Sequence, residues 1–520
     1  MARKKRNVAL MLDLEWPFKR HTNIFAGTQR FAEEQGWNSI ASPADFGGQG
    51  LPFTLACNVL ENLGTANMAF NLLPMLSVGA IEALEHHASD DIKRLYLPKL
   101  ISGAWCGTMN LTEPQAGSDV GALSSKAEPN GDGSYAITGQ KIYISWGDSD
   151  VVENICHLVL ARLPDGVPGT KGISLFLVPK FLPDAAGNPG VANRLKVVGL
   201  EHKMGLHGSP TCVMQYEGAT GWLVGGEHAG MKAMFTMMNN ARLGVGGQGI
   251  GVAEGAYQHA LRFASERKQG KALIGHSTGT ILDHADVRRM LMTMKAEIFA
   301  ARAIALDCGA AIDMSTATGD PRWSARAAFL TPIAKAFGTD TGIAVAEAGV
   351  QLHGGMGFIE ETGAAQYSRD VRVTAIYEGT NGIQAMDLVA RKLMDGGEAA
   401  GRLLDDIEAF AEATREQIPD LAGPVWQATE TLRETTEWLV GQSDLNDRFA
   451  GAVPYLKAFA RVLGGYYHLR AAAAEPTSGT RMALARFYIL RLLPEHTGLL
   501  IHARAGAEDL YSLSADGFAA

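Results

Sequence analysis

The stretch Thr108-Met-Asn-Leu-Thr-Glu-Pro-Gln-Ala-Gly-Ser-Asp119 lies between two kinds of sequence. Upstream, segments such as Ile81–Glu85 and Asp91–Leu97 carry apolar residues three to four positions apart, which predicts helices. Ser89-Asp-Asp91 predicts the start of the second of these helices. Downstream, short runs of branched and aromatic residues alternate with clusters of proline, glycine and aspartate, which predicts strands and turns. The stretch therefore opens a β region inside a largely helical chain.

The β region extends to about residue 226, and a pattern typical of helices returns at about residue 229. Strands are expected at 134–138, 141–145, 157–163 and 172–178, and Gly139-Gln140 predicts a two-residue hairpin turn. Later, Thr331-Pro332 predicts a helix break. We expect a mainly helical α+β fold with an antiparallel middle sheet. Its expected parts are a helical domain at 1–107, the β domain at 108–228, a helical bundle at 229–395 and an additional helical domain at 396–520.

Composition limits the class of protein. The chain has 520 residues, a net charge of −9 and 47% hydrophobic residues, which suits a globular protein with a sizeable core. The weak acidity argues against nucleic acid as a partner, because phosphate binding requires a concentrated basic surface. No run of about 18 apolar residues predicts a membrane span. The basic start followed by Val8–Leu12 resembles a signal peptide, but Asp13 interrupts it, so we expect none.

Several common sites lack support in the sequence. Five cysteines lie far apart with no C-x-x-C pair, which predicts free thiols and a cytoplasmic protein. His202 and His207, near Glu201, lack the spacing of a metal site, so no metal is expected. The sequence contains no G-x-S-x-G motif, so an α/β-hydrolase is not indicated. Gly244-Val-Gly-Gly-Gln-Gly249 matches the dinucleotide fingerprint, but a helix-like run precedes it, so we attribute its small residues to close helix packing.

Two further segments are candidates for chemistry. In the expected strand Lys141-Ile-Tyr-Ile-Ser145, the ring of Tyr143 and the hydroxyl of Ser145 are available to a ligand. Taken alone, ordinary strand alternation explains this pattern. Ala375-Ile-Tyr-Glu-Gly-Thr-Asn-Gly-Ile-Gln384 places Glu378 beside glycine and between apolar residues. A carboxylate desolvated there has a raised pKa and can act as a base near neutrality. Taken alone, such a glutamate is as often a helix-terminus residue as a catalyst.

These three segments, in this order, resemble the acyl-CoA dehydrogenase family from about residue 25 to residue 395. The residues that carry the resemblance are 109–119, 201–212, 235–242 and 376–384. The similarity is greatest to a long bacterial subgroup that oxidises 3-methylthiopropanoyl-CoA in dimethylsulfoniopropionate degradation, and the tail to Ala520 also resembles it. The first 25 or so residues depart from that subgroup, so we expect a truncated or altered start.

The resemblance implies a helical N-terminal domain, a middle β domain and a C-terminal four-helix bundle, followed by an extra helical domain. It also implies FAD as cofactor and oxidation of an acyl-CoA to the trans-2-enoyl-CoA. Glu378 matches the base that removes the α-proton of the thioester, while the hydride from Cβ passes to the flavin. Hydrogen bonds from the FAD ribityl hydroxyl and the Glu378 backbone N–H would stabilise the thioester carbonyl as enolate character develops.

Further residues match the family's binding positions. Tyr143 and Ser145 stand where the family has Trp and Thr, and the family's phenylalanine after the Arg267 segment is missing. The residues implied to contact substrate are Ser118, Arg242, Tyr377 and Gly379. The residues implied to contact FAD are Met109, Leu111, Thr112, Ser118, Tyr143, Ile144, Ser145, Arg267, Gln351, Gly354, Gly355, Thr380, Asn381 and Gln384.

The resemblance also implies partners. Electron-transferring flavoprotein would accept the electrons. Arg267 matches a residue that reaches the FAD of a neighbouring subunit, so a homo-oligomer, dimer or tetramer, is expected. Three alternatives stay open: a short- or medium-chain acyl-CoA dehydrogenase of β-oxidation, an acyl-CoA oxidase, and a non-catalytic binding protein with this fold.

Overall fold

The computed structural model describes residues 39–274 and 277–519. The chain divides into two compact units, residues 1–241 and 242–520, and the boundary falls inside helix α5 (Gly230–Glu266). The signal-like stretch and the expected altered start lie outside the described residues.

The first unit begins with three helices, α2 (Phe53–Ala66), α3 (Met68–His87) and α4 (Asp90–Ile101). Ser89 caps α4 by accepting a hydrogen bond from Ile92 N, which confirms the start predicted there. By length and composition one described helix, α3, could cross a membrane, but 78% of its most apolar window is buried inside the protein. Helix α3 packs on β1 so closely that a Cβ at Gly107 would lie 2.3 Å from Ala80 Cβ.

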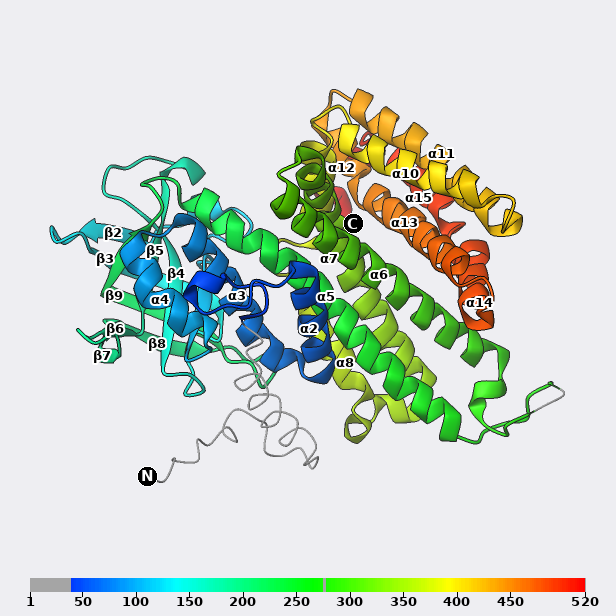
Figure 1. Cartoon of the computed structure of the whole chain (residues 1–520), viewed down its shortest axis with the longest axis horizontal. Coiled ribbons are helices and arrows are strands. Elements are labelled where there is room, and N and C mark those ends of the chain that lie inside the picture. The colour runs from blue at the N-terminus through cyan, green and yellow to red at the C-terminus, as the bar shows by residue number, and fades with distance from the viewer. Residues whose placement is uncertain (1–38, 275–276, 520) are drawn as a thin grey trace. The chain divides into compact units, whose positions relative to one another are not determined.

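Next to these helices lies a seven-stranded sheet (Figure 1). Because β4 pairs with β2 at one side and with β5 at the other, the path β4-β2-β3-β9-β5 closes into a barrel around an apolar core. The pairing is mainly antiparallel, as expected, but β1 and β2 each pair with β4 in parallel. The strands, including a separate β6–β7 pair, are β1 (Trp105–Asn110), β2 (Lys126–Pro129), β3 (Tyr135–Ser145), β4 (Asn154–Arg162), β5 (Ile173–Pro179), β6 (Phe181–Pro183), β7 (Pro189–Ala192), β8 (Leu195–Leu200) and β9 (Thr211–Val224).

The hairpin expected at Gly139-Gln140 is wrong. Strand β3 runs unbroken through both residues and pairs with β9. The glycine serves a different purpose: a Cβ there would lie 2.3 Å from Ser125 Oγ, and its φ is 151°. A residue without a Cβ allows this approach, and the strand register shifts just before it.

The second unit contains most of α5 together with α6 (Ala285–Thr318) and α7 (Pro321–Leu352). These are the longest described helices, and they lie side by side in Figure 1. Gly246 and Gly249 of α5 face the α7 backbone, where a Cβ would lie 2.7 Å from Ala334 O and 2.4 Å from Gly338 O. The fingerprint-like glycines therefore lie inside a helix, and the expectation of close helix packing is confirmed.

The break expected at Thr331-Pro332 is also wrong, because α7 continues through both residues. Thr331 Oγ1 donates to Ala327 O at 2.8 Å and Pro332 is buried. An internal proline costs a helix about 3 kcal/mol, and the packing of this 32-residue helix outweighs that local cost.

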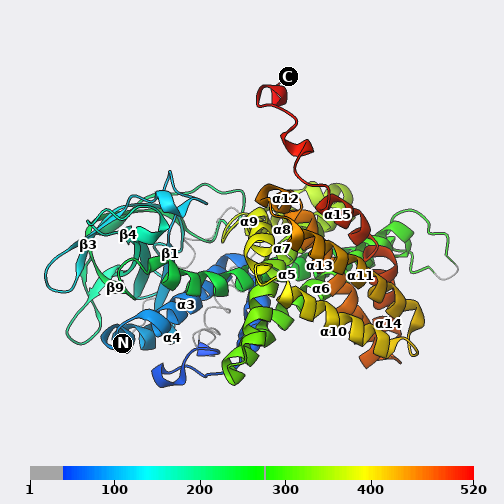
Figure 2. The ribbon, with the colours of Figure 1, turned by 90° about the horizontal axis from the view of Figure 1, so that it is seen from above.

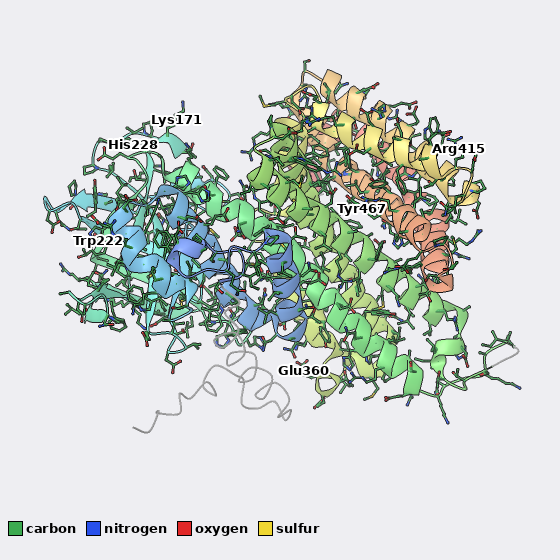
Figure 3. The ribbon with its side chains drawn as sticks, viewed as in Figure 1. Lys171, Trp222, His228, Glu360, Arg415 and Tyr467 are labelled. Carbon is green, nitrogen blue, oxygen red and sulfur yellow. The ribbon has the colours of Figure 1, made fainter. Side chains whose placement is uncertain are left out.

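The rest of the second unit is helical, and Figure 2 shows the last residues extending beyond α15. Helix α13 packs on α6 and α7. Tyr467, labelled in Figure 3, donates its hydroxyl to Asp307, and the rings of Phe329 and Phe459 lie 5.0 Å apart. These remaining helices are α8 (Ala364–Val371), α9 (Asn381–Asp387), α10 (Glu398–Thr414), α11 (Pro419–Gly441), α12 (Leu445–Ala450), α13 (Ala452–Ala474), α14 (Gly479–Phe487) and α15 (Glu495–Ala503).

Candidate active site

Glu378 lies on a sharp turn between the 3₁₀ segment Arg372–Ala375 and helix α9. Its φ of 56° and the φ of 84° at Gly379 place two consecutive residues in the left-handed region, which a glutamate rarely adopts. Gln384 Nε2 stabilises this backbone by donating to Glu378 O at 3.1 Å and to Gly379 O at 3.3 Å. Within the described part of the chain, the Glu378 N–H has no hydrogen-bond partner. The turn therefore leaves a free backbone donor in the residue that carries the carboxylate.

The carboxyl group of Glu378 has the electrostatics of a base. Burial raises its pKa to about 7, and the positive charges of Arg242 and Lys335 oppose that rise. The residue is half-buried, so it keeps some accessible surface. A carboxylate with a pKa near the working pH combines a useful ionised fraction with a high proton affinity, as general-base catalysis requires.

Two expected substrate residues accompany Glu378 in the second unit. Arg242 of α5 is 5% exposed, and its Nη1 lies 3.4 Å from Asp387 Oδ2. Its Nε is buried and has no partner in the described ranges. Tyr377 precedes Glu378 and donates its hydroxyl to Gln248, and burial raises the pKa of that hydroxyl. Arg242 thus supplies positive charge to Glu378, while Tyr377 anchors the turn to α5.

The residues that follow Gly379 make their polar contacts inside the protein. Thr380 caps α9, because Ile383 N donates to its Oγ1 at 3.3 Å. Asn381 Nδ2 donates to Asp340 Oδ1 at 2.7 Å, and Asn381 Oδ1 accepts from Lys335 Nζ at 2.9 Å. Both amide atoms of Asn381 are therefore already bonded to protein groups.

In the first unit, the loop after β1 lies against strand β3. Ile142 N donates to Thr112 O at 3.0 Å, and Lys141 Nζ donates to Leu111 O at 3.0 Å. Tyr143 sits at a break in the β3–β9 register, with a φ of 61° and 61% of its surface exposed. Such bulges re-aim side chains and are common beside active sites. The expected residues carried by these two segments are Met109, Leu111, Thr112, Tyr143 and Ser145.

Ile144 is placed differently from its neighbours. Its side chain is 2% exposed and belongs to the apolar core of the barrel. The alternation of a strand explains this, because successive side chains point to opposite faces. Only the backbone of Ile144 therefore remains for contact with a ligand.

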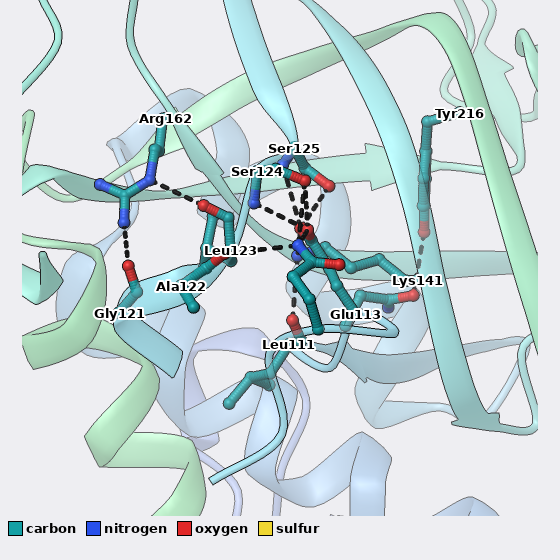
Figure 4. A network of polar contacts seen from close by, with 12 residues as sticks. Leu111, Glu113, Gly121, Ala122, Leu123, Ser124, Ser125, Lys141, Arg162 and Tyr216 are labelled. Carbon is teal, nitrogen blue, oxygen red and sulfur yellow. Dashed lines mark hydrogen bonds and ion pairs between the residues drawn. The ribbon is translucent and has the colours of Figure 1, made fainter. Parts of the chain in front are cut away.

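A buried ion pair fixes the loop to the strand (Figure 4). Lys141 Nζ lies 2.8 Å from Glu113 Oε1, and the two side chains are 0% and 2% exposed. The carboxylate also accepts from the backbone N–H of Ser124 at 2.7 Å and of Ser125 at 3.0 Å, and from both serine hydroxyls. Burial is the largest single effect on the pKa of Glu113 and acts to raise it. The charge of Lys141 and these hydrogen bonds together outweigh burial and hold the pKa of Glu113 at about 2.

The other expected residues lie on exposed surface of their own units. Gly354 has a φ of 59°, and a Cβ on Gly354 or Gly355 would meet no atom within 4 Å. The backbone there is open to a ligand. The exposed residues are Ser118, Arg267, Gln351, Gly354 and Gly355.

Neither histidine of the 201–207 segment joins a metal cluster. His207 Nε2 lies 2.8 Å from Lys203 O. Residues 39–274 and 277–519 contain no group of three or more His, Cys, Asp or Glu side chains placed to hold a metal ion.

The sequence did not lead us to predict a role for three charged residues: Glu113, Lys141 and Lys335. Glu113 lies inside the opening stretch and Lys141 begins the second segment, so both positions were available to inspection. Their pairing was not, because 28 positions separate them. Lys335 lies on α7, far from the Glu378 segment in sequence, and no local pattern marks it.

Family models match most of the chain. The N-terminal, middle and C-terminal domains of acyl-CoA dehydrogenase match residues 13–104, 108–219 and 228–394. A fourth model, an acetyl-CoA dehydrogenase C-terminal-like domain, matches residues 403–514. The extra helical region at the C-terminus therefore has relatives of its own.

Named relatives and a solved structure agree with these models. The chain is 45% identical over 459 residues to a 3-methylmercaptopropionyl-CoA dehydrogenase of Ruegeria pomeroyi, covering 85% of this chain and 77% of the relative. It is 34% identical over 485 residues to a butyryl-CoA dehydrogenase of Syntrophomonas wolfei, covering 86% and 79%. An acyl-CoA dehydrogenase of Bacillus anthracis complexed with FAD shares the fold, with a TM-score of 0.73 at 21% identity over 93% of this chain and 84% of that one. The chain therefore belongs to the acyl-CoA dehydrogenases, a family of flavin-dependent oxidoreductases that use FAD.

Proposed function

We propose that this acyl-CoA dehydrogenase oxidises 3-methylthiopropanoyl-CoA to 3-methylthioacryloyl-CoA, with Glu378 as the base. One observation supports the chemistry: a glutamate with a pKa of about 7 lies on a left-handed turn, and its own backbone N–H is free among the described residues. The choice of thioester is supported by the 45% identity to a 3-methylmercaptopropionyl-CoA dehydrogenase over most of the chain. A role in dimethylsulfoniopropionate degradation is part of this proposal.

In this proposal Glu378 removes the α-proton, which becomes bound to its carboxylate. An α-proton of a thioester is a very weak acid in water, so the developing negative charge on the carbonyl oxygen needs stabilisation. The free N–H of Glu378 provides a donor for that oxygen. When bound, FAD would supply the acceptor for the hydride that leaves Cβ. Arg242 limits the rise in the pKa of the base, which keeps part of the enzyme ionised at neutral pH.

The residues present fit FAD. In the first unit, Tyr143 offers an exposed aromatic ring on a rigid bulge, and Met109, Leu111, Thr112 and Ser145 flank it in sequence or on the adjoining loop. In the second unit, Gln384 Oε1 is buried without a partner among the described residues, and the turn at Gly354 is open. Asn381 fits less well as a direct contact, because its amide is bonded to Asp340 and Lys335.

The base is tested by Glu378→Gln, which keeps the size of the side chain and removes its proton affinity. We expect loss of turnover with FAD still bound, measured by dye reduction and by the flavin absorbance of the purified protein. Glu361→Gln is the matched control, because it makes the same change at an exposed position. Activity near the parent level in Glu378→Gln would overturn the assignment.

The substrate is tested by kcat/KM with a dye acceptor, since this ratio measures discrimination. The panel contains 3-methylthiopropanoyl-, pentanoyl-, butanoyl- and octanoyl-CoA. Pentanoyl-CoA is the key comparison, because it carries a methylene where the favoured substrate carries sulfur. The highest value for the thioether supports the proposal. An equal or higher value for butanoyl-CoA would favour the short-chain alternative, which the 34% identity to a butyryl-CoA dehydrogenase supports.

We propose electron-transferring flavoprotein as the acceptor. Hydrogen peroxide formed in air at the rate of turnover, without a dye or flavoprotein, would instead identify an acyl-CoA oxidase. A colourless protein that takes up no FAD would identify a non-catalytic binding protein.

We also propose that the protein forms a homo-oligomer and is cytoplasmic. We place the domain boundaries at residues 107, 228 and 395. The exposed Arg267 and Gln351 support contact with a second subunit. Five free cysteines support a reducing compartment. The mass in solution, measured by light scattering, distinguishes monomer, dimer and tetramer.

A further inference from the structure

Lys335 is a buried charge that the proposed reaction does not use. It lies on α7 and is 0% exposed, which is rare for a lysine unless its ammonium group is paired. Burial lowers its pKa to about 8, while the negative charges of Glu378 and Asp340 act in the opposite direction. A cation is therefore retained beside the base at neutral pH.

The ammonium group of Lys335 donates hydrogen bonds to two residues of the turn that follows Glu378. Its Nζ donates to Gly379 O at 2.9 Å and to Asn381 Oδ1 at 2.9 Å. Gly379 has a φ of 84°, so its carbonyl is held in a conformation that the local sequence alone does not favour. Lys335 thus contacts the segment that sets the direction of the Glu378 side chain.

The charges around this pair come from several elements. Arg242 of α5 and Lys335 of α7 act on Glu378 as cations, and Asp340 of α7 acts on Lys335 as an anion. Asp340 accepts from Asn381 Nδ2, and its Oδ2 lies 3.5 Å from Nζ of Lys457 on α13. Arg242 in turn has charged neighbours: Asp387 acts to raise its pKa and Arg391 acts to lower it. The Tyr377 hydroxyl is neutral at working pH, because burial raises its pKa.

We propose that Lys335 is a positioning residue for Glu378: its ammonium group holds Gly379 and Asn381 in place and supplies a buried positive charge beside the carboxylate. The inference rests on Glu378 being the base. It predicts that removing the charge of Lys335, or the anion that helps to keep Lys335 charged, raises the pKa of Glu378. A purely structural role of Lys335 makes no such prediction.

The test is the pH dependence of flavin reduction by substrate under anaerobic conditions, followed by stopped-flow absorbance on the FAD-loaded enzyme. Lys335→Met keeps the length of the stem and removes the charge, so the acid limb of the profile should move up by about one pH unit. The rate at pH 6 then falls about tenfold further than the rate at pH 9. Asp340→Asn removes an anion that helps to keep Lys335 protonated, so its acid limb should also move up, by less than in Lys335→Met.

Lys457→Met is the matched control. It removes a charge next to the same Asp340. Lys457 is about half exposed and, among the described residues, makes no hydrogen bond or ion pair with the turn, so its acid limb should stay within about 0.2 pH units of the parent. If Lys335→Met fails to fold or to hold FAD, an upward shift in Asp340→Asn supports the proposal and its absence overturns it.

Parent-like acid limbs in both variants, or a downward shift in either of them, would overturn the role of Lys335. The proposed function fails separately, through an active Glu378→Gln enzyme. An inactive Glu378→Gln together with parent-like limbs rejects only the inference about Lys335.

Discussion

Replacing Lys141 with methionine should destabilise the β domain far more than the removal of an exposed lysine from the same sheet. Lys141 and Glu113 are almost fully buried, so the substitution leaves a carboxylate without its cation. Breaking a buried pair from one side costs about 3–5 kcal/mol. Methionine keeps most of the stem volume, which makes the cavity contribution small.

The contacts of Glu113 narrow that range. The carboxylate keeps donors from Ser124, Ser125 and Gln115 after the substitution, which favours the lower half of the range. The bond from Lys141 Nζ to Leu111 O is lost as well, and the range of about 3–5 kcal/mol for removing one partner already includes such a loss. We therefore expect a loss of about 3–4 kcal/mol.

The assay is urea unfolding followed by circular dichroism and tryptophan fluorescence, at equal FAD concentration. With an m-value of about 2 kcal/mol/M, the midpoint should fall by about 1.5–2 M. The control is Lys196→Met, which breaks the Lys196–Glu217 pair, where both side chains are more than half exposed. That variant should lose less than about 1 kcal/mol. A cost for Lys141→Met no greater than for Lys196→Met would refute the reasoning.

The same pair predicts a pH effect on stability. The pKa of Glu113 is about 2 in the folded protein, below the ordinary value of a glutamate. Its contribution is therefore fully present above about pH 4.5 and is lost as the pH falls toward 2. In Lys141→Met the folded pKa rises, so the acid transition should begin at higher pH. An unchanged acid midpoint would contradict this account.

Three further predictions concern the base, the helix packing and the thiols. Because the pKa of Glu378 is about 7, kcat/KM in the parent enzyme should fall about tenfold per pH unit below that value, and a flat profile from pH 5 to 8 would contradict it. Gly249→Ala should cost about 1–3 kcal/mol in thermal unfolding, whereas Gly247→Ala, which meets no atom within 4 Å, should cost nothing or stabilise; equal effects would contradict the packing. Ellman's reagent should titrate at most one thiol in the native protein, the half-buried Cys57, and five after denaturation, since the other four are buried; two fast thiols would contradict this.

Much of the architecture could be predicted because it follows from local patterns. The helical start of α4 at Ser89, the buried strands β4 and β5 and the return to helix near residue 229 all matched the periodicity of their own residues. The glycines near 246 were correctly assigned to helix packing. The assignment used the helix-like run before them, which is also local information.

Local rules failed where a distant segment made the decision. Gly139 resembles a turn residue, yet it lies in a strand because the Ser125 side chain needs the space. Pro332 resembles a helix end, yet α7 continues through it because the packed helix stabilises the whole segment. In both cases the contact that overrides the local preference comes from another part of the chain.

By itself, the sequence determined the family, the order of the helical and β regions, and the glutamate that we propose as the base, because each depends on residues close together along the chain. Only the tertiary structure decided how that glutamate is charged and held. The left-handed turn depends on Gln384 and Lys335, and the pKa of about 7 depends on burial and on Arg242. Desolvation and charge interactions are set by distance in space, and 44 positions separate Lys335 from the carbonyl it holds.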